Sequence, residues 1–141
     1  MREILFRAKR IDNGNWVDGD LRQDRDLKTD YISGWDYYAT EGGLEREPFE
    51  YEIEPETLCQ YTGKSDEDGK KIFEGDIVGF IDLYSTESGY SESSCLGEVI
   101  WSKEECCFHV TNRLSAESWE VLDECKVVGN VFDDKEILED F

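Results

Sequence analysis

Short apolar runs alternate with turn-forming residues along most of this chain, and this pattern predicts β-strands. The first run, residues 4–8, leads to the Asn-Gly pair at residues 13–14, a strong hairpin signal, and Trp16 opens the returning strand. An aromatic-rich run at residues 31–38 is also expected to be a strand. Residues 72–132 continue as strand after strand, including a predicted strand at the Trp-Glu-Val-Leu run near their end. Since no helical pattern longer than about ten residues is present, the chain is expected to be mainly β.

Polar stretches separate these strands and are expected to lie on the surface. Residues 20–30 carry charges of both signs and fit a solvated strand or an exposed loop. Residues 40–48 contain two consecutive glycines, and residues 85–94 are rich in serine. Because neither stretch shows apolar periodicity, both are predicted to be loops.

One further polar, glycine-punctuated stretch, residues 62–71, marks a boundary between two halves. We therefore predict an N-terminal β subdomain over residues 1–63 and a C-terminal subdomain over residues 64–141. The five short strands expected in the second half are the number that a small SH3-like barrel uses. Asp133 is placed to cap a short helix. The predicted fold is mainly β, with coiled antiparallel sheets, an SH3-like barrel in the C-terminal part and one short C-terminal helical turn.

Glutamate occupies every second position of residues 50–56. In a strand, this alternation would place four carboxylates on one face and the intervening apolar side chains on the other. Pro55 favours an edge strand because proline lacks an N–H. We interpret the face as a charged edge that resists aggregation, or alternatively as a docking face for a basic partner. The four carboxylates are those of Glu50, Glu52, Glu54 and Glu56.

The 141 residues include 15 Lys and Arg against 35 Asp and Glu, a formal net charge of −20. Residues 1–63 hold eight basic and 15 acidic residues, and residues 64–141 hold seven and 20, so neither half is basic. Such a charge repels nucleic acid and anionic membranes, so neither is expected as a partner. No segment approaches the roughly 18 consecutive apolar residues of a membrane-spanning helix, and no secretory signal is evident. The expected location is the cytoplasm.

Five cysteines are present without any Cys-x-x-Cys spacing, and we interpret them as buried or half-buried thiols in a reducing compartment. A less favoured alternative is a zinc site built on Cys106, Cys107 and His109, with a distant Cys95 or Cys125. On a strand, Cys107 and His109 would share a face, which permits a thiolate–imidazole nucleophile. Because no other catalytic, metal-binding or phosphate-binding pattern is evident, the chain is expected not to be an enzyme and to need no cofactor.

Several stretches of the chain resemble the YopX family of phage and prophage proteins. The matching stretches are residues 2–8, 60–63, 68–78, 97–101 and 127–132. The resemblance implies a mainly β protein with an SH3-like C-terminal part, encoded by a phage or an integrated element. It also implies assembly as a homo-oligomer, and it supplies no catalytic residues.

The most specific part of this resemblance is the central motif, whose residues fit structural roles. Gly63, Gly69 and Gly75 are expected at turns where φ is positive. Asp76 is expected to accept a hydrogen bond from the backbone of its own turn. The residues expected to specify the fold are Gln60, Tyr61, Thr62, Gly63, Gly69, Gly75 and Asp76.

These observations favour a non-enzymatic binding or assembly protein that acts by protein–protein contact. The expected partners are copies of the chain itself and a host or phage protein. One alternative is an acidic mimic of DNA that inhibits a host nucleic-acid enzyme, with carboxylates in place of phosphates. A second alternative is a small hydrolase that uses Cys107 and His109, or a pair of carboxylates.

Overall fold

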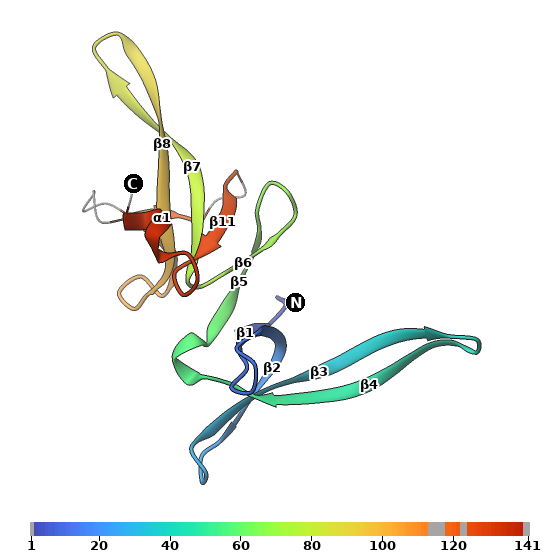
Figure 1. Cartoon of the computed structure of the whole chain (residues 1–141). Coiled ribbons are helices and arrows are strands. Elements are labelled where there is room, and N and C mark those ends of the chain that lie inside the picture. Colours follow the sequence, from blue (N-terminus) through green and yellow to red (C-terminus); the bar gives the residue numbers. More distant parts are fainter. Residues whose placement is uncertain (1, 113–117, 122–123, 140–141) are drawn as a thin grey trace. The chain divides into compact units, whose positions relative to one another are not determined.

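The structure is a computed structural model that describes residues 2–112, 118–121 and 124–139 (Figure 1). The chain forms two compact units, Met1–Tyr61 and Thr62–Phe141. This division falls close to the boundary that the sequence predicts after residue 63.

The first unit is an antiparallel sheet with strand order β4-β3-β2-β1-β5. Its elements are β1 (Phe6–Lys9), β2 (Trp16–Asp24), β3 (Thr29–Thr40), β4 (Gly43–Glu52), the short 3-10 helix η1 (Pro55–Thr57) and β5 (Cys59–Ser65), which continues into the second unit. The predicted Asn-Gly turn joins β1 to β2: Gly14 has a φ of 72° and donates its N–H to the carbonyl of Arg10 at 2.9 Å. The predicted first hairpin is therefore confirmed.

The core of the first unit is small and lies near one end of its longest hairpin. Its fully buried side chains are Ala8, Ile32 and Ile53. The partly buried side chains around them are Phe6, Val17, Leu21, Phe49 and Leu58. Because Ile32 and Ile53 lie far from the turn that joins β3 to β4, the distal part of this hairpin has no core of its own.

Residues 40–48 were expected to be a loop, and this prediction is wrong. The β3–β4 pairing runs from Tyr31 opposite Glu52 to Thr40 opposite Gly43, so most of this stretch is strand. The side chains there are exposed on both faces of the hairpin. An antiparallel ladder satisfies its backbone groups without apolar alternation, which explains why the sequence pattern missed it.

The second unit contains most of the remaining strands and the only α-helix among the described residues. Its elements are β6 (Lys71–Phe73), β7 (Asp76–Thr86), β8 (Gly89–Ser102), β9 (Cys107–Thr111), β10 (Ser118–Glu120), β11 (Lys126–Asn130) and α1 (Lys135–Glu139). β6 pairs with β5, and the other strands form an antiparallel sheet in the order β10-β9-β8-β7-β11. No helix in the described part of the chain combines the length and apolar character that a bilayer crossing requires.

The mainly-β prediction and the short C-terminal helix are confirmed, whereas the described strands of the second unit do not close into a barrel. β10 and β11 lie at opposite edges of the sheet, and closure would require its edges to pair. The strand expected at the Trp-Glu-Val-Leu run corresponds to β10, and Leu122 of that run lies outside the described residues.

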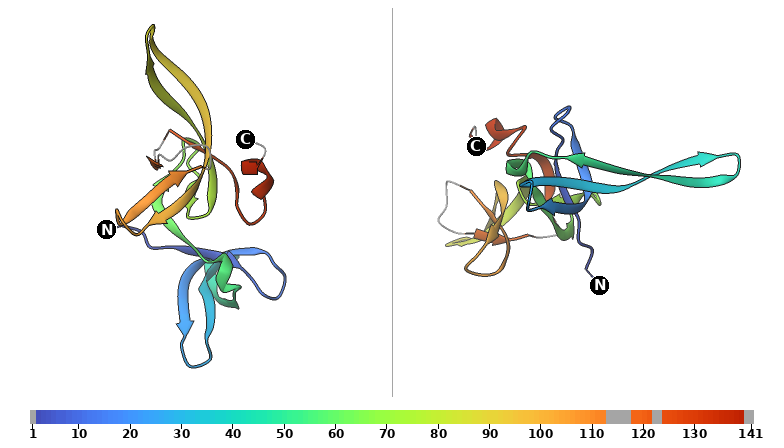
Figure 2. Two further views of the ribbon diagram at one scale, coloured as in Figure 1. Left: turned by 90° about the vertical axis from the view of Figure 1, so that its left-hand side faces the viewer. Right: turned by 90° about the horizontal axis from the view of Figure 1, so that it is seen from below.

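Residues 85–94 were also expected to be a loop, and they too are largely strand. β7 and β8 pair as far as Thr86 opposite Gly89, where Gly89 has a φ of 124°. The result is a second long hairpin, whose far end extends away from the rest of its unit (Figure 2). Both mistaken loop predictions therefore fall on the distal ends of hairpins.

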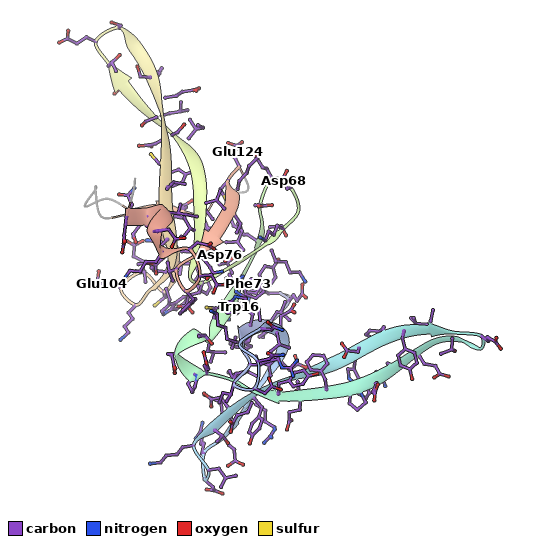
Figure 3. All side chains as sticks on the ribbon, in the orientation of Figure 1. Trp16, Asp68, Phe73, Asp76, Glu104 and Glu124 are labelled. Atoms are coloured by element: carbon purple, nitrogen blue, oxygen red, sulfur yellow. The ribbon has the colours of Figure 1, made fainter. Side chains whose placement is uncertain are left out.

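The second unit is organised around a buried apolar core and the turns of the central motif. The core residues are Ile72, Val78, Val99, Val110, Val121 and Cys125. Gly63, Gly69 and Gly75 have positive φ values of 90°, 82° and 85°, as expected. Gly69 and Gly75 lie in turns, whereas Gly63 lies within strand β5, so the turn predicted there is wrong. Asp76 is 1% exposed, and its Oδ2 accepts the backbone N–H of Phe73 at 2.8 Å (Figure 3).

Candidate protein-binding surface

The distal ends of the two long hairpins carry large apolar side chains that face solvent. We call residues 35–48 of β3 and β4 the β3–β4 arm, and residues 80–95 of β7 and β8 the β7–β8 arm. A two-stranded hairpin is only marginally stable by itself in water. Large exposed apolar patches on a protein commonly mark surfaces that contact another molecule. The two arms are therefore the first surfaces to consider as a functional site.

The β3–β4 arm has two chemically different faces. Residues directly opposite each other in an antiparallel pair project to the same side. Trp35 lies opposite Pro48, Tyr37 opposite Arg46, and Ala39 opposite Leu44, so these side chains share one face. We call this the aromatic face, and its members are Trp35, Tyr37, Ala39, Leu44, Arg46 and Pro48.

The aromatic face is exposed and carries a single cation. The exposed fractions are 62% for Tyr37 and 72% for Leu44. The Arg46 guanidinium lies 3.9 Å from the centre of the Trp35 ring, a cation–π contact. This contact holds a positive charge within an apolar surface.

The opposite side of the β3–β4 arm is acidic. Asp36 lies opposite Glu47, and Tyr38 lies opposite Glu45. The Tyr38 hydroxyl donates a hydrogen bond to Glu45 at 3.2 Å. We call this side the acidic face, with Asp36, Glu45 and Glu47 as its carboxylates. One hairpin therefore presents an apolar, cationic side and an anionic side.

The β7–β8 arm carries an apolar stripe. Ile81 lies opposite Ser94, Leu83 opposite Glu92, and Ser85 opposite Tyr90, so Ile81, Leu83 and Tyr90 share a face. The exposed fractions of Leu83 and Tyr90 are 64% and 85%. At the base of the arm, Ile81 borders a concavity of about 320 Å³. Its other apolar walls include Phe80, Leu96 and Val128.

The four alternating glutamates are divided between two elements. β4 ends at Glu52, and η1 begins at Pro55, with Glu54 as its N-cap residue and Glu56 in its first turn. Proline favours the first position of a helical turn because its φ is already suitable and its missing N–H costs nothing there. The prediction of a single strand with a row of four carboxylates is therefore wrong. The predicted edge position is confirmed, since β4 lies at the edge of its sheet.

Glu50 is the member of this group with a well-defined partner. Its two carboxylate oxygens accept hydrogen bonds from Nε and Nη2 of Arg22 at 3.0 and 2.7 Å. This hydrogen-bonded pair lowers the pKa of Glu50. Arg22 also lies over the ring of Tyr31, 4.3 Å from its centre. Glu50 is thus part of a cross-strand cluster and is not a solitary carboxylate.

Cys107 and His109 share a face of β9, and the structure adds a third group to them. Cys107 Sγ lies 3.1 Å from His109 Nε2, and Glu105 Oε2 lies 3.0 Å from the same nitrogen. In a catalytic triad, the acid orients the imidazole through the nitrogen that does not face the nucleophile. Since the thiol and the carboxylate both meet Nε2, this cluster does not have the arrangement of a nucleophilic triad.

Sequence reasoning missed Glu105 because it precedes the strand and lies in the turn between β8 and β9. Its only signal was the Glu-x-Cys-x-His spacing, which gains meaning once the turn is known. The other cysteines do not join this cluster. Cys106 lies in the same turn, where its Sγ donates to the carbonyl of Lys103 at 3.6 Å. Cys125 is buried in the core.

The prediction that the cysteines are buried or half-buried is confirmed for three of the five. Cys59 and Cys125 are buried, and Cys95 is half-buried, as the sequence predicts. Cys106 and Cys107 are exposed, contrary to that prediction. The reason is local, because both lie at the end of a hairpin where the chain leaves the core.

Comparison with known proteins places this fold in a family. The family model described as YopX protein matches residues 5–139. The chain belongs to the YopX family. It is also similar to the crystal structure of protein EF1440 from Enterococcus faecalis, with a TM-score of 0.55, 20% sequence identity, and coverage of 98% of this chain and 99% of that chain. At this identity the likeness concerns the fold alone, and no curated protein matches the chain.

Proposed function

We propose that this chain is a non-enzymatic binding or assembly protein that acts by protein–protein contact, with a second copy of itself as its first partner. The observation that carries this proposal is the pair of arms with exposed apolar faces. On the first arm Tyr37 and Leu44 are 62% and 72% exposed, and on the second arm Leu83 and Tyr90 are 64% and 85% exposed. On each arm these side chains share one face, and contiguous exposed apolar side chains commonly mark a contact surface. Covering these arms would stabilise hairpins that have little core behind them.

Charge complementarity on the β3–β4 arm favours a second copy as the partner. The aromatic face offers Arg46 within an apolar surface, and the acidic face of the same arm offers Asp36, Glu45 and Glu47. The aromatic face of one copy therefore matches the acidic face of another. Such a contact joins two different surfaces, so repeated contacts generate a closed ring or an open filament.

The test is the oligomeric state of the whole chain, measured by sedimentation velocity over a range of concentrations. We expect self-association in the wild type, and a Tyr37→Ser/Leu44→Ser double variant to dissociate at least about tenfold more readily, since exposed aromatic anchors dominate such contacts. The matched control is Leu27→Ser. Leu27 is 69% exposed, lies in the β2–β3 turn of the same unit, and belongs to neither arm.

A charge exchange makes the test more specific. Arg46→Glu alone is expected to weaken association, and mixing it with a Glu45→Lys/Glu47→Lys variant is expected to restore contact between the two proteins. A wild-type chain that stays monomeric at all concentrations would contradict the proposal. So would an oligomer that the aromatic-face variants leave intact.

The other functions considered find less support in the described residues. A DNA mimic needs its acids concentrated on one elongated surface, whereas Glu50 pairs with Arg22 and Glu67 pairs with Lys126 at 3.3 Å. On the two strands of the β3–β4 arm the carboxylates occupy one face, and the other face is apolar and carries the cation Arg46. No observation favours DNA mimicry or hydrolysis over protein contact.

A further inference from the structure

The cluster of Glu105, Cys107 and His109 gathers three kinds of metal-ligating atom in one place. The carboxylate oxygen, the thiol sulfur and the imidazole nitrogen all lie within 4.8 Å of one another. Local structure accounts for this arrangement. Cys107 and His109 are two apart on β9 and so project to the same side. Glu105 comes from the turn that precedes the strand.

The turn itself has an unusual backbone that positions this group. β8 and β9 pair up to Ser102 opposite Cys107, which leaves four residues to reverse the chain. Cys106 adopts a φ of 55°, the left-handed conformation that a glycine or asparagine would take more easily. This residue completes the reversal and brings the turn back over the start of β9.

The three side chains differ in burial in a way that suits a site with one open side. The side chain of His109 is 10% exposed, which limits its motion, and that of Glu105 is 63% exposed. Cys107 is also exposed. One ligand is therefore fixed by packing, and two are free to rotate toward an ion.

The spacing of the donor atoms is close to that of a zinc site. Zinc–nitrogen and zinc–oxygen bonds near 2.1 Å and a zinc–sulfur bond near 2.3 Å place neighbouring ligands of a tetrahedral ion about 3.5 Å apart. The two distances from His109 Nε2, 3.0 and 3.1 Å, are shorter by a few tenths of an ångström. Small rotations of the exposed Glu105 and Cys107 side chains supply this difference.

A fourth ligand would have to come from outside this group of three residues. Glu120 of β10 lies opposite His109, so its side chain leaves the same face of the sheet. Thiolate and imidazole ligands favour zinc over the hard cations calcium and magnesium, which prefer oxygen. We propose that Glu105, Cys107 and His109 form a zinc-binding site, with Glu120 or a water molecule in the fourth position.

The experiment is a titration of the reduced full-length chain with cobalt(II), followed by displacement with zinc. Cobalt bound to a thiolate gives an intense charge-transfer band in the near ultraviolet, which the surface carboxylates of an acidic protein do not produce. We expect this band to saturate at one equivalent of cobalt and to disappear when zinc is added. Loss of a metal ligand is expected to weaken binding by more than about tenfold.

Cys106 provides a matched control for Cys107, because both thiols are exposed and adjacent. Cys107→Ser is expected to abolish the charge-transfer band, and Cys106→Ser to leave it unchanged. His109→Gln and Glu105→Gln are expected to weaken binding, and Glu120→Gln decides between the carboxylate and water as the fourth ligand. Because His109 is buried, the thermal unfolding of each metal-free variant is measured to show that it is still folded. The decisive variant is Cys107→Ser, because Cys107 is exposed.

Three results would overturn the proposal. The first is the absence of a thiolate–cobalt band in the wild type, which would make the cluster a hydrogen-bonded group only. The second is an equal loss of the band in Cys106→Ser and Cys107→Ser. The third is stoichiometric zinc binding that Cys107→Ser leaves intact, which would assign the metal to surface carboxylates.

Discussion

Two carboxylates of this acidic chain, Asp66 and Glu50, show how differently the same chemical group is used in the two units. Asp66 is 7% exposed and lies in the turn between β5 and β6. Its Oδ1 accepts the backbone N–H groups of Asp68 and Lys70 at 3.0 and 2.9 Å, and its Oδ2 accepts that of Val127 at 3.0 Å. Asp66 thus fastens its own turn and connects it to β11.

Glu50, in contrast, accepts its hydrogen bonds from a single exposed side chain. Arg22 and Glu50 lie on strands that are already joined to β3 by backbone pairing. Water competes for both partners, and the pair adds no connection that the sheet lacks. A carboxylate therefore organises this fold when backbone N–H groups surround it in a buried turn, and it contributes little when an exposed cation meets it on a strand.

The largest effect is expected for Asp66→Ala. The substitution leaves backbone donors in the turn and at Val127 without their acceptor, at a cost on the order of 3 kcal/mol in the free energy of unfolding. Urea denaturation of the purified protein measures this cost. The matched control is Asp68→Ala, since Asp68 is an exposed residue of the same turn. Equal losses for the two variants would contradict the role given to Asp66.

The pH dependence of the free energy of unfolding provides an independent test of the role of Asp66. Backbone hydrogen bonds, foremost that of Val127, hold the pKa of Asp66 below its ordinary value. The unfolded chain therefore binds a proton at a higher pH than the folded chain does. The stability contributed by Asp66 is present above an unfolded-state pKa of about 3.9 and is lost as the pH falls through the lower folded-state pKa. We expect the free energy of unfolding of Asp66→Asn, measured by urea denaturation at several pH values, to fall less steeply toward low pH than that of the wild type.

A smaller effect, an increase in the free energy of unfolding, is expected for Glu98→Gln. Burial raises the pKa of Glu98, and the nearby Glu74 raises it further. The charged carboxylate of Glu98 is therefore less stable in the folded protein than in the unfolded chain, so we expect the neutral isostere to stabilise the protein by less than about 1 kcal/mol. The gain should shrink as the pH falls and the wild-type carboxyl takes up its proton. Glu92→Gln on the exposed β7–β8 arm is the control, and a gain of equal size there would show a general charge effect.

The smallest effect is expected for Glu50→Gln. Exposed ion pairs contribute little to stability, so chemical denaturation should detect no change beyond its error. The hydrogen bonds from Arg22 keep the pKa of Glu50 low, and salt is expected to raise that pKa toward its ordinary value. A loss of stability approaching that of Asp66→Ala would remove the distinction between the two carboxylates.

Much of the fold was accessible to sequence reasoning where a local rule decides the structure. The turn at Gly14 and the turns at Gly69 and Gly75 follow from residues that accept a positive φ. At the start of β7, consecutive residues from Asp76 to Val78 are buried, so an apolar run there marks a strand that is covered on both faces. Residues 40–48 and 85–94, at the distal ends of the two arms, were missed because backbone pairing to a partner strand holds them and neither stretch shows apolar periodicity. The prediction of a single strand with four glutamates on one face was wrong because Pro55 starts a helical turn where alternation alone predicted a strand.

The candidate sites were less accessible because they depend on register. The separation of the β3–β4 arm into an aromatic and an acidic face exists only when Tyr37 is paired with Arg46 and Tyr38 with Glu45. A shift of one residue in the pairing would mix the two faces. The approach of Glu105 to His109 likewise depends on the turn before β9.

By itself, the sequence determined the mainly β character, the first hairpin and the turns at Gly69 and Gly75. These properties depend on near neighbours in the chain and on the period of two along a strand. Only the tertiary structure decided which strands pair, in what register, and which of the many carboxylates lie among backbone N–H groups. The reason is that a carboxylate is chemically the same at every position, and its effect is set by groups that lie far away in the sequence, as Val127 does from Asp66.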